Sequence, residues 1–113
     1  MAYVPAGDNP IVSEFADDPE MTELVEIFVE ELPLKAQDLA GAAGIGDLER
    51  IRVLAHQMKG SAPGYGFSQL GDAAREIEEF LSDDPANALN IEELKRRVDA
   101  LIGLCQRVQG PTG

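Results

Sequence analysis

Residues 56–66 read HQMKGSAPGYG, and this stretch holds the one histidine of the chain, the end of a helix and a turn. Its first half continues a helical pattern of apolar residues. Positions three and four apart on a helix are neighbours on one face. His56, Lys59 and Gly60 are therefore expected to form one solvent-facing surface, with an imidazole beside an ammonium group and a residue that has no side chain.

The second half of this stretch predicts that the chain turns back. Pro63 has no backbone N–H to bond to the preceding turn, so it is expected to end or bend the helix. Gly64 and Gly66 favour a tight turn, because glycine adopts backbone conformations that strain other residues. We expect Gly66 to serve the backbone geometry of this turn.

A long helix is expected before the histidine helix. Asp18 suits the N-cap and Pro19 the first helical position, where unpaired backbone N–H groups are normal. Pro33 falls inside a continuous apolar periodicity, so it is expected to kink this helix rather than to end it. Gly44 and Gly46 mark its end.

The other helices follow from caps and apolar spacing. Asp47 is a suitable N-cap for the histidine helix, which is expected to cover residues 48–62. Ser68 is a suitable cap for a helix that ends near residue 81. Asn90, followed three positions later by Glu93, resembles a capping box for a last helix over residues 91–108.

Four long amphipathic helices joined by short turns predict an all-α fold, an antiparallel up-down four-helix bundle over residues 11–108. A short extra N-terminal helix is expected over residues 11–16, where Ile11, Val12 and Phe15 would cover one end of the bundle. Residues 1–10 and 109–113 are expected to be flexible tails.

The charge of the chain limits its partners. Its 113 residues carry a formal net charge of -12, and the first 34 contain no Lys or Arg. Nucleic acid is not expected as a partner, because its phosphates would be repelled. Arg50, Arg52 and Lys59 lie close to the histidine in sequence, which indicates a local positive spot for an anion.

Other site classes are disfavoured by composition. Cys105 is the one cysteine, so an intrachain disulfide is excluded; the residue is expected in the core, and neither it nor the histidine predicts a metal site. No apolar run approaches the roughly 20 residues that span a bilayer, and no signal-peptide pattern begins the chain. We expect a cytoplasmic protein without membrane contact, and a monomer.

The spacing His-x-x-Lys-Gly, with a further glycine ten residues after the histidine, resembles the histidine-containing phosphotransfer (HPt) domain family of two-component phosphorelays. The resemblance extends over roughly Ile11 to Val108. It implies a phosphocarrier rather than an ATP-using enzyme. The chain departs from the family pattern at Pro63 and Gly64, where the family often has a polar side chain such as Asn.

The resemblance also implies roles for individual residues. His56 would accept the phosphoryl group on its distal ring nitrogen, Lys59 would stabilise the phosphoryl oxygens, and Gly60 would leave clearance for a partner. Possible docking contacts follow from their place beside the histidine: Arg52, Val53 and Gln57. Val53 is expected to be exposed.

The partners implied are response-regulator receiver domains and a sensor or hybrid histidine kinase. The chain itself is expected to need no cofactor, because the receiver would supply Mg²⁺. One alternative is a phosphorylated domain of a larger chemotaxis-type kinase, although the initiating Met and the tails favour a free-standing protein. A second is a helical adaptor that binds receivers without transfer. The dimerisation domain of ordinary sensor kinases fits less well, because it expects an acid where this chain has Gln57.

Overall fold

The computed structural model describes residues 10–110. Over this range the chain is all-helical, with four α-helices and no strand, which confirms the predicted fold class. The elements are α1 (Thr22–Ile45), α2 (Leu48–Ser61), the 3-10 helix η2 (Ala62–Tyr65), α3 (Ser68–Asp83), the 3-10 helix η3 (Pro85–Leu89) and α4 (Ile91–Arg107).

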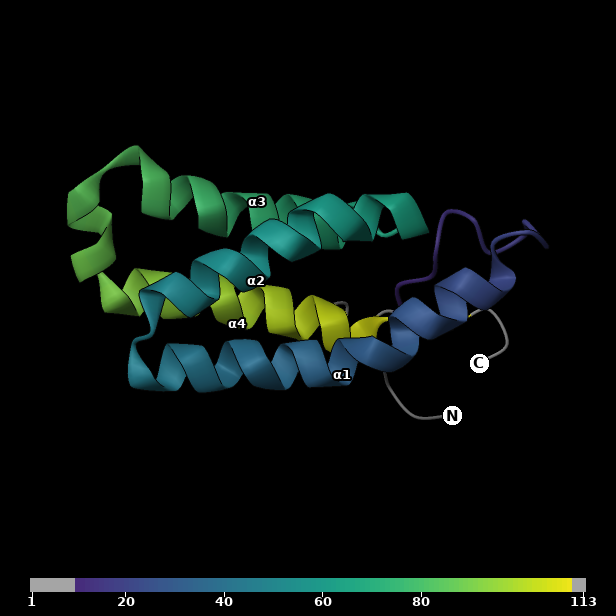
Figure 1. Ribbon diagram of the computed structural model, residues 1–113, viewed down its shortest axis with the longest axis horizontal. Helices are drawn as coiled ribbons and strands as arrows, with labels where there is room; N and C mark the ends of the chain where they lie inside the picture. The colour runs from purple at the N-terminus through teal and green to yellow at the C-terminus, as the bar shows by residue number, and fades with distance from the viewer. Residues whose placement is uncertain (1–9, 111–113) are drawn as a thin grey trace.

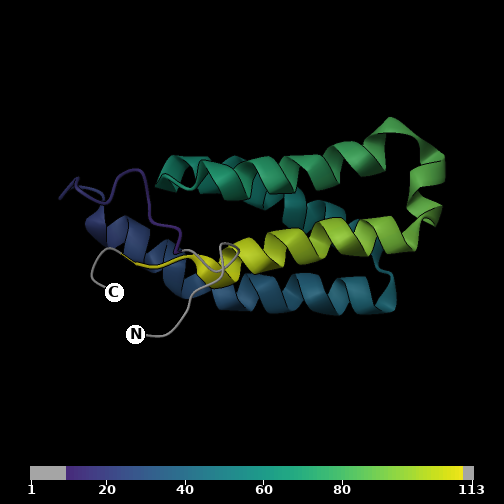
Figure 2. The same cartoon turned by 180° about the vertical axis from the view of Figure 1, so that it is seen from behind.

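The four long helices lie side by side, and in Figure 1 successive helices run in opposite directions. A two-residue connection, Gly46 and Asp47, joins α1 to α2. Figure 2 shows η3 joining α3 to α4 at one end of the molecule. Helix α1 continues through Pro33, and its ribbon changes direction part-way along its length (Figure 1).

The core lies between the helices and uses one stripe of each. The stripes expected from the sequence supply most of its fully buried large side chains: Val25, Leu32, Leu39, Ile51, Leu70, Ile77, Leu94, Val98 and Leu101. Cys105 is also buried, and burial raises the pKa of its thiol to about 11, so the thiol stays protonated at neutral pH. The apolar spacing of α1 also predicts Leu24 in the core, and that prediction is wrong, because 47% of the residue is exposed.

The prediction that α1 begins at Asp18 and Pro19 is wrong by one turn. The helix begins at Thr22, and Met21 occupies the cap position without a side-chain hydrogen bond. Asp18 instead accepts a hydrogen bond from the Glu20 N–H at its carboxylate. This local bond gives the backbone an alternative to the helix, as is common for Asp.

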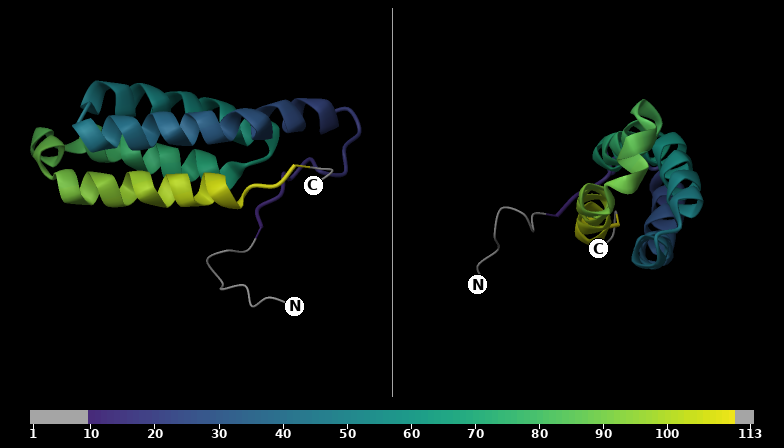
Figure 3. Two further views of the ribbon diagram at one scale, coloured as in Figure 1. Left: turned by 90° about the horizontal axis from the view of Figure 1, so that it is seen from below. Right: turned by 90° about the vertical axis from the view of Figure 1, so that its left-hand side faces the viewer.

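The short helix expected over residues 11–16 is not formed. These residues, called here the N-terminal strap, run as an extended segment that ends in turns. A six-residue helix gains little for the cost of its nucleation, and the strap finds other partners for its backbone. The Ile11 N–H donates to the Arg107 carbonyl, and the Gln109 N–H donates to the Ile11 carbonyl. Figure 3 shows the strap (purple) running beside the segment that follows α4 (yellow) at this point.

The strap also contacts the turn between α2 and α3. The Glu14 N–H donates to the Gly66 carbonyl over 2.9 Å, and the Ser13 hydroxyl donates to the Tyr65 carbonyl over 2.6 Å. Ile11 and Ser13 are buried, whereas Val12 is exposed and Phe15 is 36% exposed. The strap therefore covers one end of the bundle as an extended segment rather than as a helix.

Three of the predicted caps have different outcomes. Asp47 caps α2 by accepting from the Arg50 N–H, and Asn90 caps α4 by accepting from the Glu93 N–H; both are confirmed. Ser68 does not cap α3, because it is the first helical residue. Its hydroxyl donates to the Glu14 carboxylate of the strap instead.

The turn itself depends on Gly66, which has a φ of 86°. A Cβ at this position would collide with Ser13 Oγ and lie 2.8 Å from the Glu14 nitrogen. Glycine is therefore required both by the left-handed backbone and by the close approach of the strap. The tail predictions for residues 1–9 and 111–113 lie outside the described residues, whereas Gln109 is hydrogen-bonded to the strap.

Replacing Gly66 with alanine is expected to lower the free energy of unfolding by about 2 kcal/mol or more, because strain and collision add. Urea denaturation measures the loss. Gly64→Ala is the matched control, since a Cβ there meets nothing within 4 Å and its φ is not positive. Equal midpoints for the two variants would contradict the assignment.

Candidate functional site

His56 lies on the solvent side of α2. Its neighbours Ala55 and Met58 are buried in the core, while 69% of the His56 side chain is exposed. The solvent-facing position expected from helical spacing is thus confirmed for the imidazole. Lys59 follows one turn later, with 41% of its side chain exposed.

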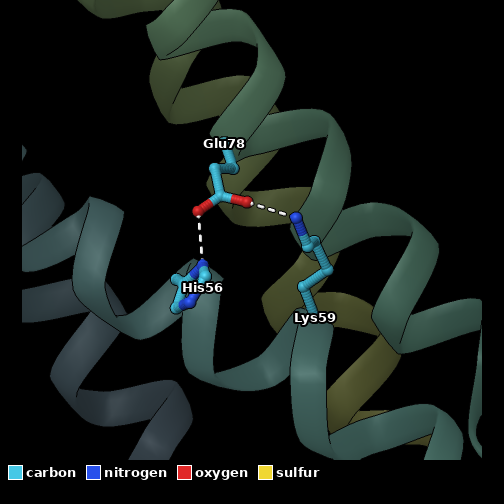
Figure 4. A network of polar contacts seen from close by, with 3 residues as sticks. All are labelled: His56, Lys59 and Glu78. Atoms are coloured by element: carbon cyan, nitrogen blue, oxygen red, sulfur yellow. Dashed lines mark hydrogen bonds and ion pairs between the residues drawn. The ribbon is translucent and has the colours of Figure 1, made fainter.

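One carboxylate connects these two side chains. Glu78 of α3 places Oε2 2.7 Å from the His56 Nδ1, and Oε1 accepts a hydrogen bond from the Lys59 ammonium, also over 2.7 Å. Figure 4 shows the carboxylate between them, with one oxygen directed at each partner. Only 19% of the Glu78 side chain is exposed, so the bridge is partly shielded from water.

The sequence did not reveal Glu78 because the contact depends on the register between two helices. Gly71 lets α3 approach the end of α2, since a Cβ there would lie 2.7 Å from Pro63 Cγ. Glu78 lies about two turns further along the same face of α3. Because α2 and α3 run in opposite directions, a residue two turns further along α3 lies beside residues earlier in α2, which here are Lys59 and His56. The signal in the sequence was that Glu78 is an acidic residue directly after Ile77, which lies in the core.

The charge of Glu78 decides which ring nitrogen of His56 carries the proton. The Lys59 hydrogen bond is the largest cause that lowers the pKa of the Glu78 carboxyl below its usual 4.5; burial opposes it, and the His56 hydrogen bond adds to the lowering. The carboxylate is therefore ionised at neutral pH and can only accept. Nδ1 must then donate, and in a neutral ring Nε2 holds the free lone pair.

Gly60 keeps the surface beside the imidazole open. A Cβ added at Gly60 would meet nothing within 4 Å. Close helix packing therefore does not explain a glycine at this position. The residue lies in the last turn of α2, on the face that also carries His56.

The three predicted docking residues are not part of the Glu78 network. Gln57 is exposed, whereas Val53 and Arg52 are half-buried, so the prediction of an exposed Val53 is wrong. Arg52 Nε is buried and has no hydrogen-bond partner among residues 10–110. Gln57 lines a small recess between α1 and α2 together with Lys35 and Leu39.

Within residues 10–110 no group of three or more His, Cys, Asp or Glu side chains is placed to hold a metal ion. No helix in this range has the length and apolar character needed to cross a membrane.

Comparison with known proteins identifies the family of the chain. The sequence model of one family, described as the Hpt domain, matches residues 23–109. The chain belongs to the Hpt domain family. No curated protein and no solved structure matched the chain. Hpt domains act in phosphotransfer within two-component signalling, where they interact with histidine kinases and response regulators. They are phosphocarrier modules rather than kinases.

Neutral His56 of this Hpt domain is expected to be protonated at Nδ1 in solution. The ¹⁵N chemical shifts of the imidazole measure this directly, with Nε2 unprotonated in the wild type. Glu78→Ala removes the acceptor and is expected to mix the two tautomers, while Glu79→Ala, on the exposed side of α3, leaves them unchanged. A wild-type ring protonated at Nε2 would contradict the assigned hydrogen bond.

The lowered pKa of Glu78 also predicts a pH-dependent contribution to stability. The ionised carboxylate stabilises the folded state above the ordinary value of 4.5, and this stabilisation is lost as pH falls through the lowered folded-state pKa. Glu78→Gln is expected to cost about 0.5 kcal/mol near neutral pH, as for a partly exposed ion pair. Urea unfolding at neutral and at acidic pH tests this; a cost that persists in acid would refute it.

Proposed function

We propose that this Hpt domain accepts a phosphoryl group on His56 and relays it between the aspartates of receiver domains. The observation that carries the proposal is the exposed imidazole whose Nδ1 donates to Glu78. That hydrogen bond leaves Nε2 with the lone pair a nucleophile needs. A single histidine in the chain makes the acceptor unambiguous.

The transfer step follows from this protonation state. The Nε2 lone pair attacks the phosphorus of a receiver aspartyl phosphate, and an N–P bond forms as the P–O bond to the aspartate breaks. The aspartate carboxylate leaves with the electron pair. The ring becomes cationic because it keeps its proton at Nδ1, where it donates to the Glu78 carboxylate.

The remaining chemistry is assigned to the partner. We infer that a receiver supplies Mg²⁺ and that this chain needs no cofactor of its own. Lys59, which is paired with Glu78, is the cation nearest in sequence to the phosphoryl group on His56, and Gly60 gives the partner loops room above the ring. Arg52, Val53 and Gln57 are kept as proposed docking contacts, and Gln57 is the exposed one of the three. The proposal further takes the protein to be a cytoplasmic monomer.

His56→Gln is expected to abolish labelling when the chain is mixed with receivers charged by a small-molecule phosphodonor. The wild-type label should be lost in acid and retained in base, as for phosphohistidine. A panel of receivers is needed, because the partner is not specified by the site. Equal labelling of the two proteins, or none from any receiver, would instead favour the adaptor; label taken only from a kinase domain would favour the chemotaxis-type kinase.

Gly60→Ala is expected to make the protein more stable and its phosphoryl transfer slower. Alanine should raise helix stability by up to about 1 kcal/mol, because it meets no atom within 4 Å. Transfer from a receiver should nevertheless slow by about tenfold or more, because the methyl group narrows the approach to the ring.

Gly41→Ala is the matched control, since Gly41 is helical, exposed and equally unobstructed. It should change stability in the same direction without slowing transfer. Equal transfer rates for the two alanine variants would show that Gly60 provides no clearance.

A further inference from the structure

Glu78 pairs with His56 and Lys59, and the charges around both side chains change when His56 carries a phosphoryl group. Before transfer, its two oxygens pair with the His56 Nδ1 and the Lys59 Nζ. After transfer, the phosphoryl oxygens become a second set of anionic partners for the same ammonium. Glu78 and the phosphoryl group therefore compete for Lys59.

The position of the three side chains favours Glu78 in this competition. The Glu78 side chain is 19% exposed, whereas those of Lys59 and His56 are 41% and 69% exposed. A phosphoryl group on the exposed ring would be well hydrated, and hydration weakens its attraction for Lys59. The less exposed carboxylate is the better-shielded partner. Lys59 is thus partly withheld from the phosphoryl oxygens.

The same carboxylate acts on the ring. With Nε2 phosphorylated, the ring bears a positive charge for as long as Nδ1 keeps its proton, and Glu78 favours that charged form. When a receiver aspartate or water takes the phosphoryl group, a new P–O bond forms, the N–P bond breaks and its electron pair returns to Nε2. A ring protonated at Nδ1 then leaves as neutral imidazole, whereas an unprotonated ring would have to leave as an anion, which is far less favourable.

Both effects shorten the lifetime of the phosphohistidine: the withheld ammonium leaves the phosphoryl oxygens less stabilised, and the Nδ1 proton lets the ring leave as neutral imidazole. We propose that Glu78 is a positioning residue that makes the phosphohistidine short-lived and a strong donor, so that phosphate passes readily from this domain. This inference rests on the proposed function, because it concerns the group carried by His56. It differs from a purely orienting role, in which Glu78 would speed transfer to and from the ring alike and leave the balance between them unchanged.

Glu78→Gln is the variant that tests this inference. It keeps the size of the side chain and an oxygen that can accept from Nδ1, and it removes the charge. Wild type and variant are phosphorylated with phosphoramidate, which needs no receiver, and ³¹P NMR follows the loss of phosphohistidine at one pH near neutrality. We expect the phosphohistidine to last about threefold longer or more in Glu78→Gln, given the size of exposed ion-pair effects.

Two further variants control the measurement. Glu79→Gln makes the same charge change on the exposed side of α3 and should leave the lifetime at the wild-type value. Lys59→Ala combined with Glu78→Gln separates the two effects: the part of the gain due to released Lys59 disappears, and the part due to the ring charge remains. A circular dichroism spectrum and a urea midpoint confirm that each variant is folded.

The outcomes separate this inference from the proposed function. A Glu78→Gln phosphohistidine that decays as fast as the wild type, or faster, would overturn the inference while the relay role of His56 stands. A wild-type chain that takes no label at His56 from phosphoramidate or from any receiver would overturn the proposed function itself. A longer lifetime in Glu79→Gln equal to that in Glu78→Gln would also overturn the inference, because net charge alone would explain it.

Discussion

The reversal of the chain at Gly66 determines how α2 and α3 lie against each other, and the site depends on that register. The positive φ of Gly66 turns the chain, and the strap holds the turn through Ser13 and Glu14. Gly71 then lets α3 pack closely against the end of α2. Because helices are stiff, this local geometry is carried two turns along the pair. The His56–Glu78 contact is therefore a consequence of the turn as much as of the residues that make it.

The sequence predicted those features that depend on one helix at a time. Apolar spacing identified the core stripes, and Asp47 and Asn90 were recognised as caps because each bonds within its own first turn. The exposure of His56 followed from its place in the helical pattern of apolar residues. Predictions that depended on a second segment were less successful. Ser68 does not cap α3, because its hydroxyl bonds to Glu14. The strap does not form a helix, because its backbone bonds to residues far along the chain. Glu78 was missed for the same reason.

A small electrostatic unit sets the chemistry of an otherwise acidic molecule. The chain carries a net charge of -12, yet the side chains at His56 are balanced locally: one carboxylate, one ammonium and one titratable ring. Long-range repulsion makes the overall surface a poor place for another anion. The shared carboxylate fixes the proton on the ring, and the adjacent ammonium keeps that carboxylate ionised. The carboxylate of Glu78 thus links the ring to the ammonium.

The strap has a consequence for the order in which the molecule assembles. The helices and the α2–α3 turn are made of contacts between residues close in sequence, which form early and cheaply. The hydrogen bonds of Ile11 to Arg107 and Gln109 join segments from nearly opposite ends of the chain. Closing such a long loop costs conformational entropy, and this cost becomes small only once the bundle has brought the two segments together. We therefore expect the strap to dock last and to open first. In amide hydrogen exchange, the amides of the strap are expected to exchange faster than those of the helices. Opening of the strap would expose the α2–α3 turn while the helices stay folded.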